Sequence, residues 1–291
     1  AAHETIALTR AELDVTDSEA VQDAVRAARP DVVIGCAAWT DVDGAEREVE
    51  AAQAVNGAGA GNVAAAAMAC GAWTIHVSTD YVFDGSKRTP YVESDPVRPL
   101  SAYGRSKLAG ERAVAERAPD AHTIARTAWL FGARGRCFPS TMLRLAGERE
   151  ELSVVADQVG CPTFTGHLAA ALVGLAEQRE RTVGVVHLAA SGECSWYGFA
   201  RAVLAAGGTR SGAAPARVRP IATSEYPTPA PRPAYSVLRS ERGAPVLPAW
   251  QDGLAAFMHE LSQAPADAMP PADAQRQAGW PGTHAAPGRS A

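Results

Sequence analysis

The chain has 291 residues, a formal net charge of −5 and a mean hydropathy of −0.10. A chain of this length can hold one large domain or two modest ones, with an ample core. The acidic balance gives no electrostatic reason to expect nucleic acid as a partner, and no apolar run approaches the length of a membrane span. We therefore expect neither nucleic-acid binding nor membrane insertion.

The five cysteines are scattered along the chain, and none forms a CxxC pair. This spacing favours reduced, mostly buried thiols over disulfides or a zinc site. The chain does not open with a basic segment followed by an apolar stretch, the pattern of an export signal. Together these features predict a cytoplasmic protein.

Strand and helix patterns alternate along the first half of the chain. Apolar runs at residues 30–38, 73–77 and 123–131 predict buried strands, and a shorter run at 4–8 precedes them. Strands that alternate with helices at this spacing predict an α/β fold with a doubly wound parallel sheet of the Rossmann type. The predicted helices of this half cover residues 18–28 and 45–69 and a segment that begins at Tyr103.

The second half shows weaker alternation. Residues 207–233 are rich in proline, glycine and arginine, and we expect them to cross the surface. Helices are expected at 138–149, 166–177, 196–206 and 250–261, and strands at 152–155 and 183–188. The predicted organisation is a Rossmann-type domain at 1–150, to which the strand at 183–188 could return, a smaller domain at 151–263, and a disordered tail rich in proline, alanine and glycine at 264–291.

Three polar side chains are predicted to meet at one edge of the sheet. Thr79 follows the strand at 73–77, at the carboxyl end where open α/β sheets place their ligands. Tyr103 and Lys107 are four residues apart at the start of a helix, so they share one face. A nearby ammonium favours the phenolate and would lower the phenol's pKa, which is ordinarily near 10. The three groups suit ketone reduction, in which hydride reaches carbon while Tyr103 protonates the oxygen held by Thr79.

Lysine is rare in this chain. Of the 27 basic residues only Lys87 and Lys107 are lysine, and the others are arginine. An ammonium has a tunable pKa, whereas a guanidinium stays charged. The retention of lysine at position 107 therefore supports a chemical role there.

With these motifs the chain resembles the extended short-chain dehydrogenase/reductases, and within them most closely the dTDP-4-dehydrorhamnose reductase subfamily. The resemblance covers residues 4 to about 262. It implies NADPH-dependent reduction of the 4-keto group of dTDP-4-dehydro-β-L-rhamnose to give dTDP-β-L-rhamnose, with NADH as a possible alternative cofactor. The matching segments are AAWTDVD (37–43), STDYVFDG (78–85), YGRSKLAGE (103–111), RTAW (126–129), DQVGCPT (157–163), SGECSW (191–196) and RPAYS (232–236).

The resemblance also implies roles for individual residues. The catalytic set falls on Thr79, Tyr103 and Lys107, and the last two also contact the cofactor. The sugar-nucleotide contacts fall on Thr79, Asp80 and Trp129, and the alternative for Trp129 is a core aromatic at a strand end. Asp43 and Asp84 are expected to be cap and loop residues. The further cofactor contacts fall on Asp14, Val15, Ala38, Trp39 and Thr40.

Three departures from the family pattern are informative. An acidic residue in the family would bind the ribose hydroxyls at the position where this chain has Thr9-Arg10. This replacement resembles the pattern of enzymes that prefer NADP. Thr165-Gly166-His167 opens the helix on which some relatives carry a metal-binding glutamate, so we expect no metal. The family's first strand and glycine-rich turn, about 25 residues, do not precede Glu4. We expect the sequence to be an N-terminally truncated form, or one with a misplaced start, of an intact reductase.

Two other functions remain open at this point. A nucleotide-sugar epimerase or 4,6-dehydratase would share the fold, but a dehydratase usually carries Asp-Glu after the active-site threonine, and here Asp80 is followed by Tyr81. A non-catalytic NADP-binding regulatory subunit is the second alternative. Intact Thr79, Tyr103 and Lys107 favour the enzyme. We expect a dTDP-4-keto-6-deoxy sugar as substrate and a monomer or homodimer.

Overall fold

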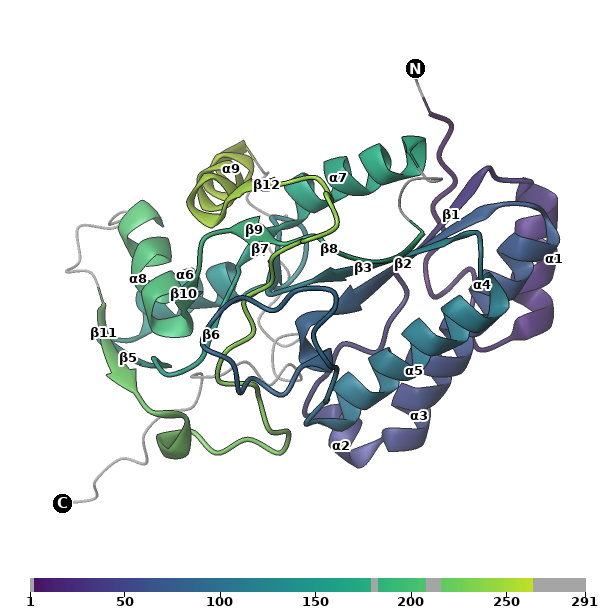
Figure 1. Ribbon diagram of the computed structural model, residues 1–291. Helices are drawn as coiled ribbons and strands as arrows, with labels where there is room; N and C mark the ends of the chain where they lie inside the picture. Colours follow the sequence, from purple (N-terminus) through teal and green to yellow (C-terminus); the bar gives the residue numbers. More distant parts are fainter. Residues whose placement is uncertain (1–2, 179–182, 208–215, 264–291) are drawn as a thin grey trace.

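The centre of the protein is a parallel sheet, seen in a computed structural model that describes residues 3–178, 183–207 and 216–263 (Figure 1). Four strands lie in the order β1-β2-β3-β8, and every neighbouring pair is parallel. The predicted α/β fold with a parallel sheet is confirmed, and the strand near 183–188 does return to it. The strands are β1 (Val32–Gly35), β2 (Trp73–Thr79), β3 (His122–Thr127) and β8 (Gly184–His187).

Helices cover both faces of this sheet (Figure 1). On one face α4 and α5 pack against β3, and on the other α7 packs against β2 and β8. Local signals start two of the helices, since Asp17 caps α1 and the Ser101 hydroxyl accepts the Gly104 N–H at the start of α5. The helices of this part are α1 (Ser18–Ala28), α2 (Gly44–Arg47), α3 (Val49–Gln53), α4 (Ala60–Ala69), α5 (Ala102–Arg117) and α7 (Thr165–Glu177).

The helix predicted over residues 45–69 is interrupted. A π-helical turn, η1 (Ala54–Gly59), lies between α3 and α4. The side chain of Asn56 within it is fully buried and bonded to groups outside the helix. The turn lies against Gly110 of α5, where a Cβ atom would come 2.1 Å from the Asn56 carbonyl oxygen. Such π-helical turns often occur at functional sites.

The segment at residues 4–8, predicted to be a strand, forms none. It is exposed and pairs with none of the described strands, and Ile6 and Leu8 remain 60% and 52% exposed. An extended segment becomes a strand only when a neighbour satisfies its backbone N–H and C=O groups. The apolar composition of the segment therefore misled the prediction.

The second half of the chain forms a separate core beside the sheet (Figure 1). Its centre is aromatic, with Phe131, Phe138, Phe199 and Phe257 nearly or fully buried around Trp196. Its helices are α6 (Phe138–Glu148), α8 (Trp196–Gly207) and α9 (Trp250–Gln263). Its strands pair as β4 (Leu130–Phe131) with β7 (Thr163–Phe164), β5 (Glu151–Val155) with β11 (Arg217–Ile221), β6 (Val159–Gly160) with β10 (Cys194–Ser195), and β9 (Ala190–Ser191) with β12 (Leu247–Ala249).

Two expectations for this half need comment. Strand β11 lies inside the segment 207–233 that was expected to cross the surface, and its residues 217–220 are exposed or half-buried there. The register with β5 buries Ile221 and explains why the strand forms. Residues 208–215 and the predicted tail at 264–291 lie outside the described residues.

The burial of the cysteine thiols and the lengths of the helices can be compared with the sequence predictions. All five cysteines are free, with Cys137 and Cys161 buried but Cys36 and Cys70 exposed, so the expectation that they are mostly buried holds only in part. In the described part of the chain, no helix has the length and apolar character that crossing a membrane requires.

Candidate active site

The structure brings Thr79 and Tyr103 together at the carboxyl end of β2. Thr79 is the last residue of the strand, and Tyr103 lies in the first turn of α5. Their side chains share a hydrogen bond. The Thr79 hydroxyl also donates to Oδ1 of Asp80 at 3.0 Å and accepts the N–H of Tyr81 at 3.2 Å. A hydroxyl and a phenol are thus held side by side, as the sequence predicts.

The pKa of Tyr103 shifts in the direction opposite to the prediction. Burial raises it to about 12, with a smaller opposing effect from the hydrogen bond to Thr79. Lys107 is not among the groups that shift the pKa of Tyr103, because its ammonium points to other partners. A phenol with a high pKa keeps its proton at neutral pH, which suits a group that must donate that proton to a developing alkoxide.

Lys107 is buried one helical turn beyond Tyr103, with 2% of its surface exposed. Its Nζ donates to the carbonyl oxygen of Val77 at 2.8 Å and lies 3.3 Å from Nε2 of His76. Burial lowers the pKa of Lys107 to about 8, while Glu111 and Cys36 act to raise it. The sequence predicts the position of Lys107 but not its contact with His76.

A buried ion pair lies next to this lysine. The Arg126 guanidinium on β3 donates two hydrogen bonds to Glu111 of α5, at 2.9 and 2.7 Å, and both side chains are 5% exposed. Ser78 donates to the same carboxylate at 2.6 Å. The pair joins α5 to both β2 and β3, so it fixes the helix that carries Tyr103 and Lys107.

The predicted cofactor segments lie close to each other. Val15 and Ala37 line the same small cavity together with Gly35 and Gly59. The loop that contains Ala38, Trp39 and Thr40 follows β1 directly. Asp14 is exposed, and its carboxylate accepts hydrogen bonds from the backbone and hydroxyl of Thr16.

Asn56 is a positioning residue that sequence reasoning missed. Its Oδ1 accepts the N–H of Trp39 at 2.8 Å, and its Nδ2 donates to the Trp39 carbonyl at 3.1 Å and to Ser106 Oγ at 2.9 Å. One amide therefore clamps the loop of the predicted cofactor contacts to the helix of Tyr103 and Lys107. An asparagine inside a long alanine-rich helical segment was the available signal.

The two predicted substrate residues occupy different environments. Asp80 is 1% exposed, and burial raises its pKa to about 6 against the opposing effect of hydrogen bonds from Ser236 and Thr79. Trp129 is half-buried and has a φ of 47°, rare for an aromatic residue. Its indole stacks on Trp196 with ring centroids 3.5 Å apart, and a Cβ on Gly160 would lie 2.4 Å from it. Backbone strain of this kind is often retained at functional sites.

Asp43 has a larger role than the predicted cap. Its carboxylate makes no cap hydrogen bond in α2 and instead pairs with Arg232 at 2.8 Å and accepts the N–H of Ala230 at 3.0 Å. This pair ties the loop after β1 to the second half of the chain. Asp84 is the loop residue that was expected, because it accepts hydrogen bonds from Ser86 and Tyr91.

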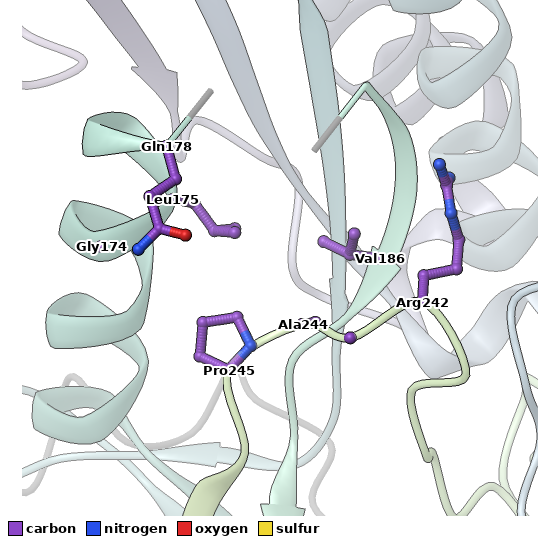
Figure 2. Close-up of a pocket in the computed structure, with 8 residues that line it drawn as sticks. Gly174, Leu175, Gln178, Val186, Arg242, Ala244 and Pro245 are labelled. Atoms are coloured by element: carbon purple, nitrogen blue, oxygen red, sulfur yellow. The ribbon is translucent and has the colours of Figure 1, made fainter. Parts of the chain in front are cut away.

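A cavity of about 480 Å³ lies elsewhere in the molecule, between the end of α7 and the loop at residues 242–245. Figure 2 shows Leu175 of α7 and Gln178, which follows the helix, on one side of it and Val186 and Arg242 on the other. The Arg242 guanidinium is engaged, since it donates to the carbonyl oxygens of Val183 and Val185. None of the predicted site residues lines this cavity, so it is separate from the candidate active site.

Metal-binding groups are not clustered at the site. Across residues 3–178, 183–207 and 216–263, the side chains of histidine, cysteine, aspartate and glutamate form no group of three or more that could hold a metal ion.

A parallel sheet with a threonine, a tyrosine and a lysine at the carboxyl ends of its strands defines the class of nicotinamide-dependent oxidoreductases that the sequence resembles. The chain belongs to the family described as the RmlD substrate binding domain, whose model matches residues 1–263.

Several of the similar proteins bear the name of one reductase. The chain is 46% identical over 272 residues to a dTDP-4-dehydrorhamnose reductase of Burkholderia thailandensis, covering 89% of this chain and 91% of the relative. It is 45% identical over 278 residues to the enzyme of the same name from Mycolicibacterium smegmatis, covering 92% and 83%. The crystal structure of dTDP-4-dehydrorhamnose reductase from Bacillus anthracis in complex with NADP matches with a TM-score of 0.82 and 38% identity, covering 87% of this chain and 89% of that one.

Proposed function

We infer that this protein is an NADPH-dependent oxidoreductase that reduces the 4-keto group of dTDP-4-dehydro-β-L-rhamnose to give dTDP-β-L-rhamnose. The observation that carries the inference is the hydrogen-bonded pair of Thr79 and Tyr103 at the end of β2, with Lys107 buried one helical turn away. Relatives at 45–46% identity bear the name of this reductase, and a similar structure was solved in complex with NADP.

We propose that the described residues hold part of a nicotinamide dinucleotide. Val15 and Ala37 line one cavity, the Trp39 backbone is clamped by Asn56, and Lys107 brings an ammonium to the end of the sheet. We propose that Asp14, Val15, Ala38, Trp39 and Thr40 hold the cofactor and that Tyr103 and Lys107 contact its nicotinamide ribose. When bound, NADPH supplies the hydride that goes to the carbonyl carbon.

The side chains of the protein handle the proton and the oxygen. Thr79 holds the substrate oxygen by a hydrogen bond, which orients the carbonyl toward Tyr103. Tyr103 donates its phenolic proton to that oxygen as negative charge develops there. The high pKa of Tyr103 keeps the proton in place until the alkoxide, a stronger base than phenolate, is forming.

We propose that Asp80 and Trp129 contact the sugar nucleotide. Trp129 lies next to the end of the sheet, where its indole stacks on Trp196 and Gly160 approaches the ring closely. We further propose that residues 1–150 with β8 bind the cofactor, that residues 151–263 mainly bind the substrate, and that the protein acts in the cytoplasm as a monomer or homodimer.

The test is an assay of the purified protein with the dTDP-4-keto sugar and NADPH. Stoichiometric oxidation of NADPH, with dTDP-L-rhamnose identified by NMR, is the expected result. An epimerase or dehydratase would change the sugar without net consumption of NADPH. A regulatory subunit would bind NADPH in calorimetry and leave the sugar unchanged, and either outcome would contradict the proposal.

A further inference from the structure

His76 lies on the central strand of the sheet, buried beneath the candidate active site with 3% of its surface exposed. Its neighbours Thr74 and Ser78 point to the same face of β2, because side chains alternate along a strand. This face meets α5, from which Lys107 reaches the imidazole: Nζ and Nε2 are 3.3 Å apart. The sequence motifs give His76 no role.

The protonation states of Lys107 and His76 decide which of them donates the hydrogen bond. An ammonium carries three N–H donors and no acceptor, so a nitrogen 3.3 Å from a charged Lys107 must be unprotonated. Burial and the nearby Lys107 both lower the pKa of His76 well below its ordinary value, which keeps the imidazole neutral at pH 7. A neutral ring with its proton on Nδ1 presents a free Nε2 to the lysine.

We propose that His76 is a positioning residue that accepts a hydrogen bond from Lys107 and, together with the Val77 carbonyl, holds the ammonium in one place. Two of the three N–H bonds of Lys107 then point into the sheet, to Nε2 of His76 and to the carbonyl oxygen of Val77 at 2.8 Å. The third remains for the ribose of the cofactor, and this last step rests on the proposed function.

The other groups near Lys107 cannot replace this acceptor. Glu111 on the same helix is engaged by Arg126 and Ser78, and Cys36, from the segment after β1, carries a sulfur that is only a weak hydrogen-bond acceptor. The charges of Glu111 and Cys36 both act to raise the pKa of Lys107. Loss of the His76 acceptor should therefore make the charged lysine less stable and lower its pKa.

The test measures Lys107 directly by NMR with lysine labelled with ¹³C at Cε. The sequence holds only two lysines, so the variant Lys87→Arg leaves a single signal that reports Lys107. In this background His76→Phe should lower the pKa of Lys107 by about one unit, a tenfold change in its proton dissociation constant, because one hydrogen bond to the charged form is lost. His76→Gln keeps an acceptor oxygen and should largely restore the wild-type value.

The control is His122→Phe. His122 is also a buried histidine on a sheet strand, but its Nδ1 contacts the Ala118 carbonyl at 2.6 Å, so its loss should leave the pKa of Lys107 unchanged. An unchanged or raised pKa of Lys107 in His76→Phe would overturn the proposal, since a raised value would mean that His76 is a cation repelling the lysine.

A second measurement decides the matter if the His76 variants fail to fold. The ¹⁵N shifts of the wild-type imidazole should show an unprotonated Nε2 and no titration of His76 near pH 7. A proton on Nε2, or a His76 that titrates near neutrality, would contradict the proposal. Both readouts are independent of turnover, so a failure of the proposed reductase activity would be seen separately as a wild-type protein that does not oxidise NADPH.

Discussion

The two faces of strand β2 differ in chemistry although they come from the same seven residues. Trp73, Ile75 and Val77 face α7 within an apolar cluster that includes Leu168 and Leu172. The opposite face carries Thr74, His76 and Ser78 and meets Lys107 and Glu111 of α5. Burying polar groups in a sheet costs free energy unless each finds a partner. The comparison indicates that one face serves stability and the other positions the catalytic groups.

The largest effect on turnover is expected at Tyr103, in the first turn of α5. Tyr103→Phe removes only a hydroxyl and should reduce kcat by about 10²- to 10⁴-fold, because the proton donor is lost. The melting temperature should change little. Steady-state NADPH oxidation and thermal unfolding measure the two quantities. Tyr91→Phe, which also deletes a hydrogen-bonded phenol hydroxyl, is the matched control and should keep its activity. A Tyr103→Phe enzyme with near wild-type kcat would remove Tyr103 from the mechanism.

Breaking the buried ion pair should affect stability strongly. Glu111→Gln leaves the Arg126 charge buried without its counter-charge, and we expect a loss of about 3–5 kcal/mol in the free energy of unfolding. Urea denaturation gives the value. Glu116→Gln changes an exposed glutamate on the same helix and should cost almost nothing. If the two variants unfold at the same urea concentration, the pair does not hold α5 against the sheet.

The pH dependence of kcat should report Lys107. The pKa of Lys107 is lowered by burial to about 8, so the ammonium loses its proton as the pH rises through that value. We expect kcat to fall above about pH 8, by up to tenfold for each further pH unit. Between about pH 8 and 10.5 the unfolded chain binds the proton and the folded one does not, so the contribution of Lys107 to stability rises with pH. A profile that stays flat beyond about pH 9.5 would mean that the ammonium is not required.

The smallest effect is expected on the apolar face. Ile75 is fully buried in the cluster against α7, and Ile75→Val should cost about 1 kcal/mol in unfolding free energy through one lost methylene. Because this face does not touch Lys107 or Tyr103, kcat should remain unchanged. Denaturant unfolding and turnover measured on the same sample test the separation. A large fall in kcat would show that the two faces are coupled.

The sequence predicts the catalytic groups better than their surroundings. The place of Thr79 at a strand end and the four-residue spacing of Tyr103 and Lys107 on one helix are local features, so each of them follows from secondary structure. The contacts of His76 with Lys107 and of Asn56 with Trp39 join residues 31 and 17 positions apart, and only tertiary packing creates them. The predicted direction of the shift in the pKa of Tyr103 was wrong for the same reason, since the shift depends on burial and not on sequence distance.

The strand pattern also carried more information than the prediction used. Residues 73–77 were read as one apolar run, yet Trp73, Thr74, Ile75, His76 and Val77 alternate between apolar and polar. Alternation in a strand covered by helices on both sides marks a buried polar face. On this face Ser78 and His76 contact Glu111 and Lys107, whereas the Thr74 hydroxyl has no hydrogen-bond partner among the described residues. The segment at 4–8 shows the converse, because apolar composition without a neighbouring strand produced none.

Hydride transfer from NADPH to the sugar is tested most directly by isotope transfer. NADPH that carries deuterium at the nicotinamide C4 is incubated with the protein and the dTDP-4-keto sugar, and the product is examined by NMR. Reduction as proposed places deuterium at C4 of the sugar and consumes one NADPH for each product molecule. In the control, unlabelled NADPH is used in deuterated solvent, and C4 of the sugar should carry no deuterium. A product without cofactor-derived deuterium at C4, or a changed sugar with NADPH intact, would contradict the assignment of this chain as a reductase.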